Sequence, residues 1–233
     1  MIAALRNLLF PAICLACHAE IADQRKLLCP CCAGALVPLD PTSRCLICFS
    51  ALIDEIRICE GCRLQRPKIT RATAPFSDTG PAKELLERFL SGHLILKELL
   101  SAYMTFQFLK LDLPYPDRIV PVPESSLRRW ERGFSPSELL ADRVGQILER
   151  PVSKLLGRYS GDFPQRRLSI EKRKALQPSC FFWKKKEDLL GETILLVDDR
   201  MGTSATLSAC AAVLSEGFAA RVYGLTFCIE ELF

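Results

Sequence analysis

The chain has 233 residues and a formal net charge of +4, and 49% of its residues are hydrophobic and 25% charged. That length suits one well-buried core with a small appendage, or two small domains. No uninterrupted apolar run reaches the roughly 18 residues needed to cross a bilayer, so a transmembrane helix is not expected. The mild excess of positive charge does not by itself indicate a nucleic-acid partner.

The first residues carry a weak targeting pattern. Residues 1–16 hold one Arg and an apolar run that ends at Cys17, which has some likeness to a secretory signal or a lipoprotein cleavage site. Pro11 interrupts that run, and Cys14 stands where a lipobox has Leu. We therefore expect a cytoplasmic protein.

Cysteine usage divides the chain. Nine of the twelve cysteines precede residue 63, and eight of these form four C-x-x-C pairs. This spacing lets a tight turn point two thiolates at one metal ion, so four pairs predict two structural zinc sites, each with four cysteine ligands. The pairs are Cys14 and Cys17, Cys29 and Cys32, Cys45 and Cys48, and Cys59 and Cys62.

The cysteine pattern leaves other arrangements open. A secreted disulfide framework is disfavoured, because the rest of the chain has the pattern of an intracellular α/β domain. The pairs either share metals in sequence order, which we favour, or interleave. His18 could replace a thiolate, although its position favours a solvent-facing turn residue.

The pattern changes after residues 65–76. Residues 1–65 lack the apolar periodicity of a core and are predicted to be a zinc-ribbon module, and residues 66–233 an α/β domain. Helical spacing of apolar residues occurs in 82–92 and 94–109, and residues 118–123, RIVPVP, predict a short strand.

Residues 135–149 predict an amphipathic helix. Ser135 is its expected N-cap, Pro136 its first-turn proline and Glu138 the partner in a capping box. Its expected buried face consists of Leu139, Leu140, Val144, Ile147 and Leu148.

The C-terminal part alternates strand, helix and strand. TILLVDD, residues 193–199, suits a strand buried on both faces, residues 206–216 a helix stopped by Gly217, and RVYGLTFCI, residues 221–229, a last strand. Such alternation predicts a parallel sheet with helical crossovers, whose ligands lie at the carboxyl ends of strands. Asp198 and Asp199 fall at that position.

The segment ILLVDDRMGTSAT, residues 194–206, predicts a ribose 5-phosphate site. Backbone N–H groups at a helix start attract phosphate, and Thr203, Ser204 and Thr206 add hydroxyl donors. Asp198 and Asp199 repel an anion but can accept ribose hydroxyls or Mg²⁺-bound water.

Three other interpretations were considered for this segment. A response-regulator receiver has its acidic pair after the strand that opens the domain, and here too little chain follows. A P-loop would need G-x-x-x-x-G-K-[ST], which is absent. A purely structural turn between strand and helix remains an alternative.

The same segment resembles the phosphoribosyl-pyrophosphate (PRPP) loop of type I phosphoribosyltransferases. With the C-x-x-C pairs, IVPVP, RRWERGFS, the Q-x-x-L-x-x-x-x-R pattern at 165–173 and the final strand, the resemblance extends to the ComF family over nearly the whole chain. It implies a type I phosphoribosyltransferase-like α/β fold, a parallel sheet with flanking helices, preceded by a small Cys-rich zinc-ribbon module.

The resemblance also implies a function and a set of site residues. Asp198 and Asp199 would meet the ribose hydroxyls and hydrated Mg²⁺, and Arg132 and Arg173 would face pyrophosphate or a nucleic-acid phosphate. The 5-phosphate would be held by Gly202, Thr203, Ser204, Ala205 and Thr206. The activity would be displacement of pyrophosphate from PRPP, and members of the family are associated with DNA uptake during natural competence.

Several positions depart from the family pattern. Gly202 replaces the first Thr of the loop, Ser204 replaces a Gly, and Arg200 replaces an apolar residue. Phe89 stands where a lysine is common, with Arg88 one place away. Because these losses fall on groups that would handle pyrophosphate and nucleobase, the sequence supports ligand binding better than turnover.

A non-catalytic role with single-stranded DNA is the alternative function. Residues 154–186 hold ten Lys and Arg against two acids, interleaved with Phe163, Phe181, Phe182 and Trp183. Aromatic rings can stack bases while cations follow the backbone. The competing interpretation is that the cations form a solvated face and that the rings are core or loop anchors. Cys180, Cys210 and Cys228 are expected to be buried thiols.

The zinc assignment generates a prediction. Because residues 1–65 lack a core of their own, removing zinc is expected to leave them disordered. Limited proteolysis of the full chain with and without a chelator measures this, and new cleavage sites before residue 66 are expected. A cleavage pattern that does not respond to the chelator would contradict the prediction.

Overall fold

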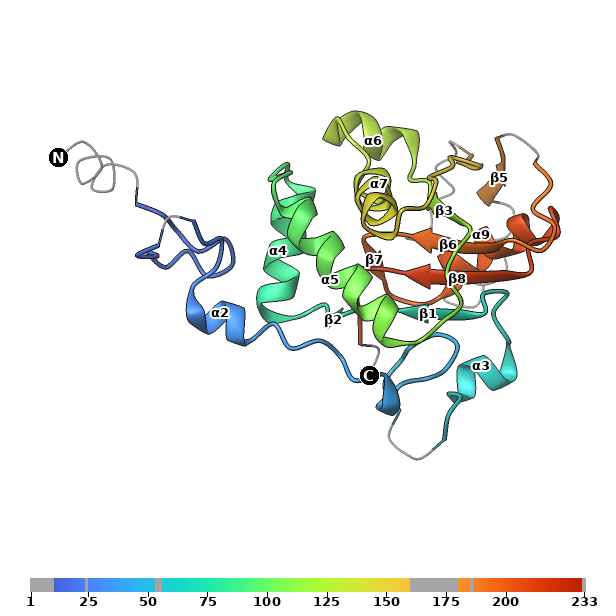
Figure 1. Ribbon diagram of the computed structural model, residues 1–233, viewed down its shortest axis with the longest axis horizontal. Coiled ribbons are helices and arrows are strands. Elements are labelled where there is room, and N and C mark those ends of the chain that lie inside the picture. The colour runs from blue at the N-terminus through green and yellow to red at the C-terminus, as the bar shows by residue number, and fades with distance from the viewer. Residues whose placement is uncertain (1–10, 24, 53–55, 160–179, 185–186, 232–233) are drawn as a thin grey trace.

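The structure is a computed structural model that describes residues 11–23, 25–52, 56–159, 180–184 and 187–231. Its centre is a parallel β-sheet with helices on both faces, as the alternating pattern of the sequence predicts (Figure 1). The sheet is built from four strands in the order β1-β8-β6-β3, and all neighbours are parallel. These strands are β1 (Arg71–Thr73), β8 (Arg221–Leu225), β6 (Thr193–Val197) and β3 (Arg118–Pro121).

Three of these strands continue past a short break. A second parallel sheet has the order β2-β9-β7, which repeats the order of β1, β8 and β6. Its strands are β2 (Phe76–Ser77), β9 (Cys228–Ile229) and β7 (Arg200–Met201). Two residues separate β1 from β2, β8 from β9 and β6 from β7. The expected final strand, 221–229, is accordingly divided into β8 and β9.

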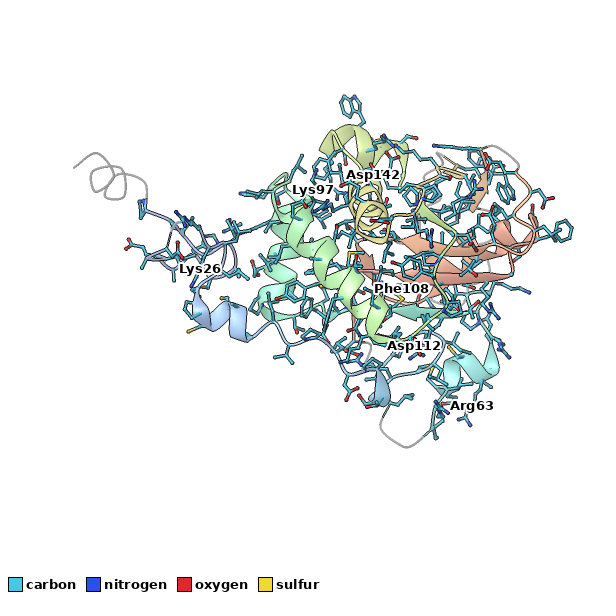
Figure 2. The ribbon with its side chains drawn as sticks, in the orientation of Figure 1. Lys26, Arg63, Lys97, Phe108, Asp112 and Asp142 are labelled. Carbon is cyan, nitrogen blue, oxygen red and sulfur yellow. The ribbon has the colours of Figure 1, made fainter. Side chains whose placement is uncertain are left out.

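Two hydrophobic clusters cover the two faces of the sheet. Strand β6 is buried along its whole length, as predicted, and its side chains alternate between the clusters. Leu195 and Val197 pack with the helices α4 (Gly80–Leu90), α5 (Leu96–Lys110) and α7 (Pro136–Leu148). Ile194 and Leu196 pack with α9 (Ala205–Ser215) on the other face. Figure 2 labels Phe108 on α5, whose ring packs edge-on against Tyr223 of β8 at 6.4 Å between centroids.

Shorter elements connect this framework. Strands β4 (Leu156–Arg158) and β5 (Phe181–Trp183) pair antiparallel. Helix α6 (Ser126–Arg132) follows β3 and ends at Gly133, whose φ of 81° suits a glycine at a helix C-terminus. In the Cys-rich segment lie α2 (Pro30–Gly34), a 3-10 helix (Pro41–Ser43) and α3 (Glu60–Leu64).

The Cys-rich segment packs against both faces of the sheet. Cys14, Cys29 and Cys32 belong to the cluster of α4, α5 and α7, whereas Cys45 and Cys62 belong to the cluster of α9. Figure 1 shows the segment of the first group beside α4 and that of the second below β1. Backbone hydrogen bonds join the segment to the strands: the N–H of Ala72 donates to Ile47 and that of Leu39 to Pro75, both at 2.7 Å.

Helix α7 begins and ends close to where it was predicted, but its capping differs. Ser135 makes no side-chain hydrogen bond to the helix N-terminus, and its Oγ lies 3.2 Å from that of Ser137. Glu138 instead forms ion pairs with Arg129 at 2.5 Å and Lys154 at 2.6 Å. The predicted capping box is therefore wrong, because two cations from other segments engage its acidic partner.

The buried face of α7 also differs in part. Leu140, Val144 and Leu148 are buried as predicted, whereas Leu139 is only partly buried and Ile147 is 39% exposed. Ala141 and Gly145 are buried in addition. A Cβ on Gly145 would lie 2.6 Å from Cγ2 of Val152, so glycine lets α7 lie close to that side chain.

Among the described residues, no helix combines the length and the apolar character that crossing a bilayer requires. The Lys/Arg-rich segment is described only in part, because residues 160–179 and 185–186 lie outside the described ranges.

The packing of α9 on the sheet generates a prediction. A Cβ on Gly224 of β8 would lie 2.6 Å from Cδ1 of Leu207, a buried residue of α9. Gly224→Ala is therefore expected to lower the free energy of unfolding by about 1 to 3 kcal/mol, the usual cost of overfilling a packed core. Urea denaturation measures it. Gly34→Ala, where a Cβ meets no atom within 4 Å, is the matched control, and equal losses in both variants would contradict the prediction.

Candidate functional site

The Cys-rich segment forms two separate four-thiol groups. One consists of Cys14, Cys17, Cys29 and Cys32, the other of Cys45, Cys48, Cys59 and Cys62, and within each group the sulfur atoms lie within 4.8 Å of one another. The cysteine pairs therefore group in sequence order, the arrangement that the spacing favours. Each group could hold a metal ion.

The spacing of the sulfur atoms fits tetrahedral zinc. Zn–S bonds of about 2.3 Å place two sulfur ligands about 3.8 Å apart. The Sγ atoms of Cys17 and Cys29 lie 3.7 Å apart, and those of Cys48 and Cys59 lie 3.5 Å apart. His18 is outside the thiol group and contacts the guanidinium of Arg88 instead.

Each group also contains one thiol that ionises easily. Hydrogen bonds from the Cys62 thiol lower the pKa of Cys48 to about 4, against the effect of its burial. Burial raises the pKa of Cys14, but the N–H groups of Cys17, Cys29 and Ala16 outweigh it and bring the value to about 6. A thiolate is the form that binds zinc, so both groups hold a ligand that needs little proton release at neutral pH.

Asp198 and Asp199 occupy the break between β6 and β7. The N–H of Asp198 donates to Leu225, and the carbonyl of Asp199 accepts from Phe227 at 3.0 Å, so the ladder to the β8–β9 strand continues through the break. The N–H of Asp199 donates to the carboxylate of Asp198, and the N–H of Arg200 to that of Asp199, both at 2.9 Å. Backbone bonds on both sides therefore hold the acidic pair.

The two acids are electrostatically coupled. Burial, and then the charge of Asp199, raises the pKa of Asp198 well above its usual value. Burial also raises the pKa of Glu124, with a further contribution from Asp199 and an opposing one from Arg132. Carboxylates placed this closely favour a bound cation or hydroxyl donors.

A cleft of about 430 Å³ opens over this break. Its lining contains five carboxylates and four guanidinium groups, which come from segments far apart in the sequence. The charged residues are Glu87, Glu124, Asp198, Asp199 and Glu230, and Arg128, Arg132, Arg158 and Arg200. A volume of this size suits a small polar ligand. Of the charged set, the sequence singled out only Asp198, Asp199 and Arg132 as site residues.

Arg200 and Glu230 shape the cleft, and neither was predicted to do so. The guanidinium of Arg200, which stands where the resemblance has an apolar residue, forms ion pairs with Glu87 at 2.5 Å and Asp78 at 3.3 Å. A Cβ on Gly202 would lie 2.7 Å from a carboxylate oxygen of Glu230. Glycine at 202 therefore leaves room for that carboxylate.

The predicted phosphate loop is divided between two cavities. Gly202 and Thr206 line the acidic cleft. Thr203, Ser204 and Ala205 line a second cleft of about 420 Å³, which Gly202 also borders and which lies between α9 and the second four-thiol group. The loop thus forms the wall between the two cavities.

Arg132 lines the acidic cleft and forms an ion pair with Glu124 at 3.3 Å. Arg173, the second cation predicted to face an anion, lies outside the described residues, as does the pattern at 165–173. Phe89 is fully buried and lies 6.1 Å from the ring of Phe134 between centroids. It contributes no charge where the resemblance has a lysine.

The described aromatic residues of the Lys/Arg-rich segment pack against other parts of the protein, although Phe182 and Trp183 are only partly buried. Phe181 is buried, the ring of Phe182 lies 4.5 Å from that of Tyr159 between centroids, and the indole Nε1 of Trp183 donates to the carbonyl of Val213 at 2.9 Å. They are anchors of the β4–β5 hairpin, the alternative weighed in the sequence, and Phe163 lies outside the described residues. Cys210 and Cys228 are buried thiols as predicted, while Cys180 is only partly buried.

The parallel sheet with helices on both faces, the acidic pair in its strand break and the two N-terminal four-thiol groups define a class: a type I phosphoribosyltransferase-like α/β protein with a Cys-rich module. Its relatives in sequence support an assignment to the ComF family. No family profile matches it.

Three relatives carry this assignment. The chain is 28% identical over 219 residues to "Competence protein ComFC" of Bacillus subtilis, covering 92% of this chain and 82% of that protein. It is 29% identical over 230 residues to "DNA utilization protein YhgH" of Salmonella typhi, covering 94% and 97%. It is 25% identical over 213 residues to "Competence protein F" of Haemophilus influenzae, covering 86% and 90%.

Two solved structures align more loosely. A purine phosphoribosyltransferase from Pyrococcus horikoshii aligns with 56% of this chain and 86% of its own, at a TM-score of 0.35 and 16% identity. A phosphoribosylpyrophosphate synthetase from Mycobacterium smegmatis aligns with 55% of this chain and 33% of its own, at 0.30 and 16%. The class of the protein follows from its own sheet and site and from its relatives in sequence.

The raised pKa of Asp198 generates a pH prediction. Because the folded-state pKa of Asp198 is raised, the folded protein holds a proton that the unfolded chain releases, and stability falls as pH rises from the unfolded pKa to the folded one. Asp198→Asn removes this loss and keeps an oxygen that can accept the N–H of Asp199. Denaturant unfolding from pH 4 to pH 8 should show the variant gaining stability over the wild type as pH rises. A difference that does not change with pH would contradict the assignment.

Proposed function

We propose that the protein binds PRPP or a related ribose 5-phosphate in the acidic cleft, together with Mg²⁺. The observation that carries the proposal is the pair Asp198 and Asp199, held by backbone bonds in a strand break and lining one cleft with Thr206 and Arg132. Carboxylates accept hydrogen bonds from ribose hydroxyls and from Mg²⁺-bound water, whereas cations and helix starts favour the phosphate groups.

The charges of the cleft favour a ligand with two kinds of group: hydroxyl groups or a metal ion for the carboxylates, and phosphate for the guanidinium groups. The carboxylates of Asp198, Asp199 and Glu124 face the part of the ligand that donates hydrogen bonds or binds metal. Arg128, Arg132 and Arg158 line the same cleft and supply positive charge for phosphate or pyrophosphate. An uncharged sugar would leave these guanidinium groups without a partner from the ligand.

Our proposal is for binding rather than turnover. In glycosyl transfer from PRPP, Mg²⁺ and cationic side chains stabilise the departing pyrophosphate. Phe89 supplies no charge where the resemblance has a lysine, and Ser204 stands where it has a glycine. With these groups changed, the remaining acids and cations suffice to hold a ribose phosphate, and a transferase activity would require a further cation from the chain.

The names of the relatives connect the family to competence and DNA utilization. We therefore place the proposed binding in the context of DNA uptake or use, with the DNA-uptake machinery as the expected partner. Direct binding of single-stranded DNA is less well supported. Of the described aromatic side chains at 181–183, Phe181 is buried and Trp183 donates its N–H to Val213, although much of the Lys/Arg-rich segment lies outside the described residues.

The proposal predicts Mg²⁺-dependent binding of PRPP that depends on the acidic pair. Asp199→Asn removes the negative charge but keeps an oxygen that can accept the N–H of Arg200. Isothermal titration calorimetry should show at least about a tenfold weaker affinity, equivalent to about 1.4 kcal/mol. Omitting Mg²⁺ should weaken binding to the wild type in the same direction.

Asp142→Asn is the matched control, since Asp142 is an exposed carboxylate on α7 that does not line the cleft (Figure 2). It makes the same change in charge and should bind PRPP as the wild type does. Thermal unfolding of each variant separates a lost contact from a lost fold. Equal affinities of the wild type and a folded Asp199→Asn would overturn the proposal.

A further inference from the structure

A third cavity lies far from the acidic cleft in the fold. It has a volume of about 340 Å³ and lies at the amino-terminal end of β1, whereas the acids lie beyond the carboxyl end of β6. Its lining comes from the 3-10 helix region, the segment before α3, the start of β1 and the end of α5. The residues are Asp40, Pro41, Thr42, Arg44, Leu46, Ile56, Arg57, Arg71, Lys110 and Leu111.

Four cations from four separate segments meet at this cavity: Arg44, Arg57, Arg71 and Lys110. Arg44 is buried and balanced, because its guanidinium forms an ion pair with Glu231 at 2.7 Å. Among the residues that the structure describes, no ion pair joins a carboxylate to any of the other three cations. The positive charge of the cavity is therefore only partly compensated.

The one carboxylate that lines the cavity is engaged elsewhere. Asp40 caps the 3-10 helix by accepting the N–H of Thr42 at 3.0 Å. The hydrogen bond from Thr42 and the charge of Lys110 both lower the pKa of Asp40, so this carboxylate partly balances Lys110. Among the described residues it forms no ion pair with Arg57 or Arg71.

Arg71 has an unmet hydrogen-bonding requirement. Its Nε is buried and has no hydrogen-bond partner among the described residues. A buried, charged donor without an acceptor costs free energy, and an oxyanion removes the cost by accepting from it. Guanidinium groups present several N–H donors in a planar fork that matches phosphate geometry.

We propose that this cavity is a binding site for a phosphate-type oxyanion, held by the guanidinium groups of Arg71 and Arg57 with Lys110 at its edge. The ligand is a phosphomonoester or a phosphodiester, since both present the charged oxygen atoms that the cations require. The site is independent of the proposed PRPP site, and its residues come from the Cys-rich segment as well as from the α/β domain.

In the experiment, the full chain loaded with zinc is titrated with inorganic phosphate, and isothermal titration calorimetry measures the affinity. Arg57→Gln changes an exposed residue and should leave the fold intact. It should weaken phosphate binding about tenfold or more, the loss expected when a hydrogen bond between charged groups is removed. Arg71→Lys keeps the charge of the more buried position but loses the planar fork, and should also weaken binding.

Two controls separate this site from other cations. Arg63→Gln removes a charge from α3 in the same segment but outside the cavity (Figure 2), and Arg132→Gln removes one from the acidic cleft. Neither control variant should change the affinity of the phosphate site that Arg57→Gln weakens. Phosphate binding that responds to Arg132→Gln and not to Arg57→Gln would overturn the proposal.

Two other ways to balance the charge make opposite predictions. If the cations balance thiolates bound to zinc, Arg57→Gln would accelerate loss of zinc and leave phosphate binding unchanged. Asp54 and Glu55 lie outside the described residues; if they supply the counter-charge, phosphate would bind to the double variant Asp54→Asn, Glu55→Gln and not to the wild type. Either result would overturn the proposal.

Competition identifies the source of the phosphate group. A nucleoside monophosphate that displaces inorganic phosphate, while an oligonucleotide without terminal phosphates does not, supports a phosphomonoester. Displacement by that oligonucleotide, lost in Arg57→Gln, supports a phosphodiester.

Discussion

Two adjacent carboxylates held in a strand break are the constraint on which the acidic cleft depends. Asp198 and Asp199 sit where three parallel strands are interrupted at the same level, and the ladder to the neighbouring strand persists through the break. The backbone therefore cannot move the acids apart. Burial and their mutual repulsion raise the pKa of Asp198, and four guanidinium groups line the same cleft. A cation or hydroxyl donors from a ligand would relieve the repulsion.

The N-terminal Cys-rich segment is part of the same packing. Its two four-thiol groups contribute to hydrophobic clusters on opposite faces of the sheet. The second group borders a cleft whose other wall is the start of α9, and the N–H of Lys68 donates to the Ser208 hydroxyl of that helix at 2.8 Å. The second group therefore shares a cleft with residues 202–205, of which Gly202 also lines the acidic cleft.

Local patterns in the sequence predicted several elements well. The C-x-x-C spacing identified both thiol groups, because a tight turn brings two thiolates together whatever surrounds it. The unbroken apolar run of β6 favoured a strand buried on both faces, and the strand is buried along its whole length. The capping box of α7 failed because Glu138 is drawn to Arg129 and Lys154, an outcome that depends on where α6 and the segment at 154 lie. Likewise, the sequence allowed Trp183 to stack on a nucleic-acid base, whereas in the fold its indole N–H donates to the carbonyl of Val213.

The sequence by itself determined the thiol groups, the alternation of strands and helices, and the position of the acidic pair after an apolar strand. Each of these depends on spacing along the chain and on hydrophobicity, which are local. Only the tertiary structure decided which distant charges join the acids: Glu87 from α4, Glu230 from beyond β9 and Arg158 from β4 reach one cleft. It also decided that Arg200 is neutralised by Glu87 and Asp78 and that Arg71 has a buried Nε without an acceptor among the described residues. Such pairings depend on distances in space between charges, which no spacing along the chain encodes.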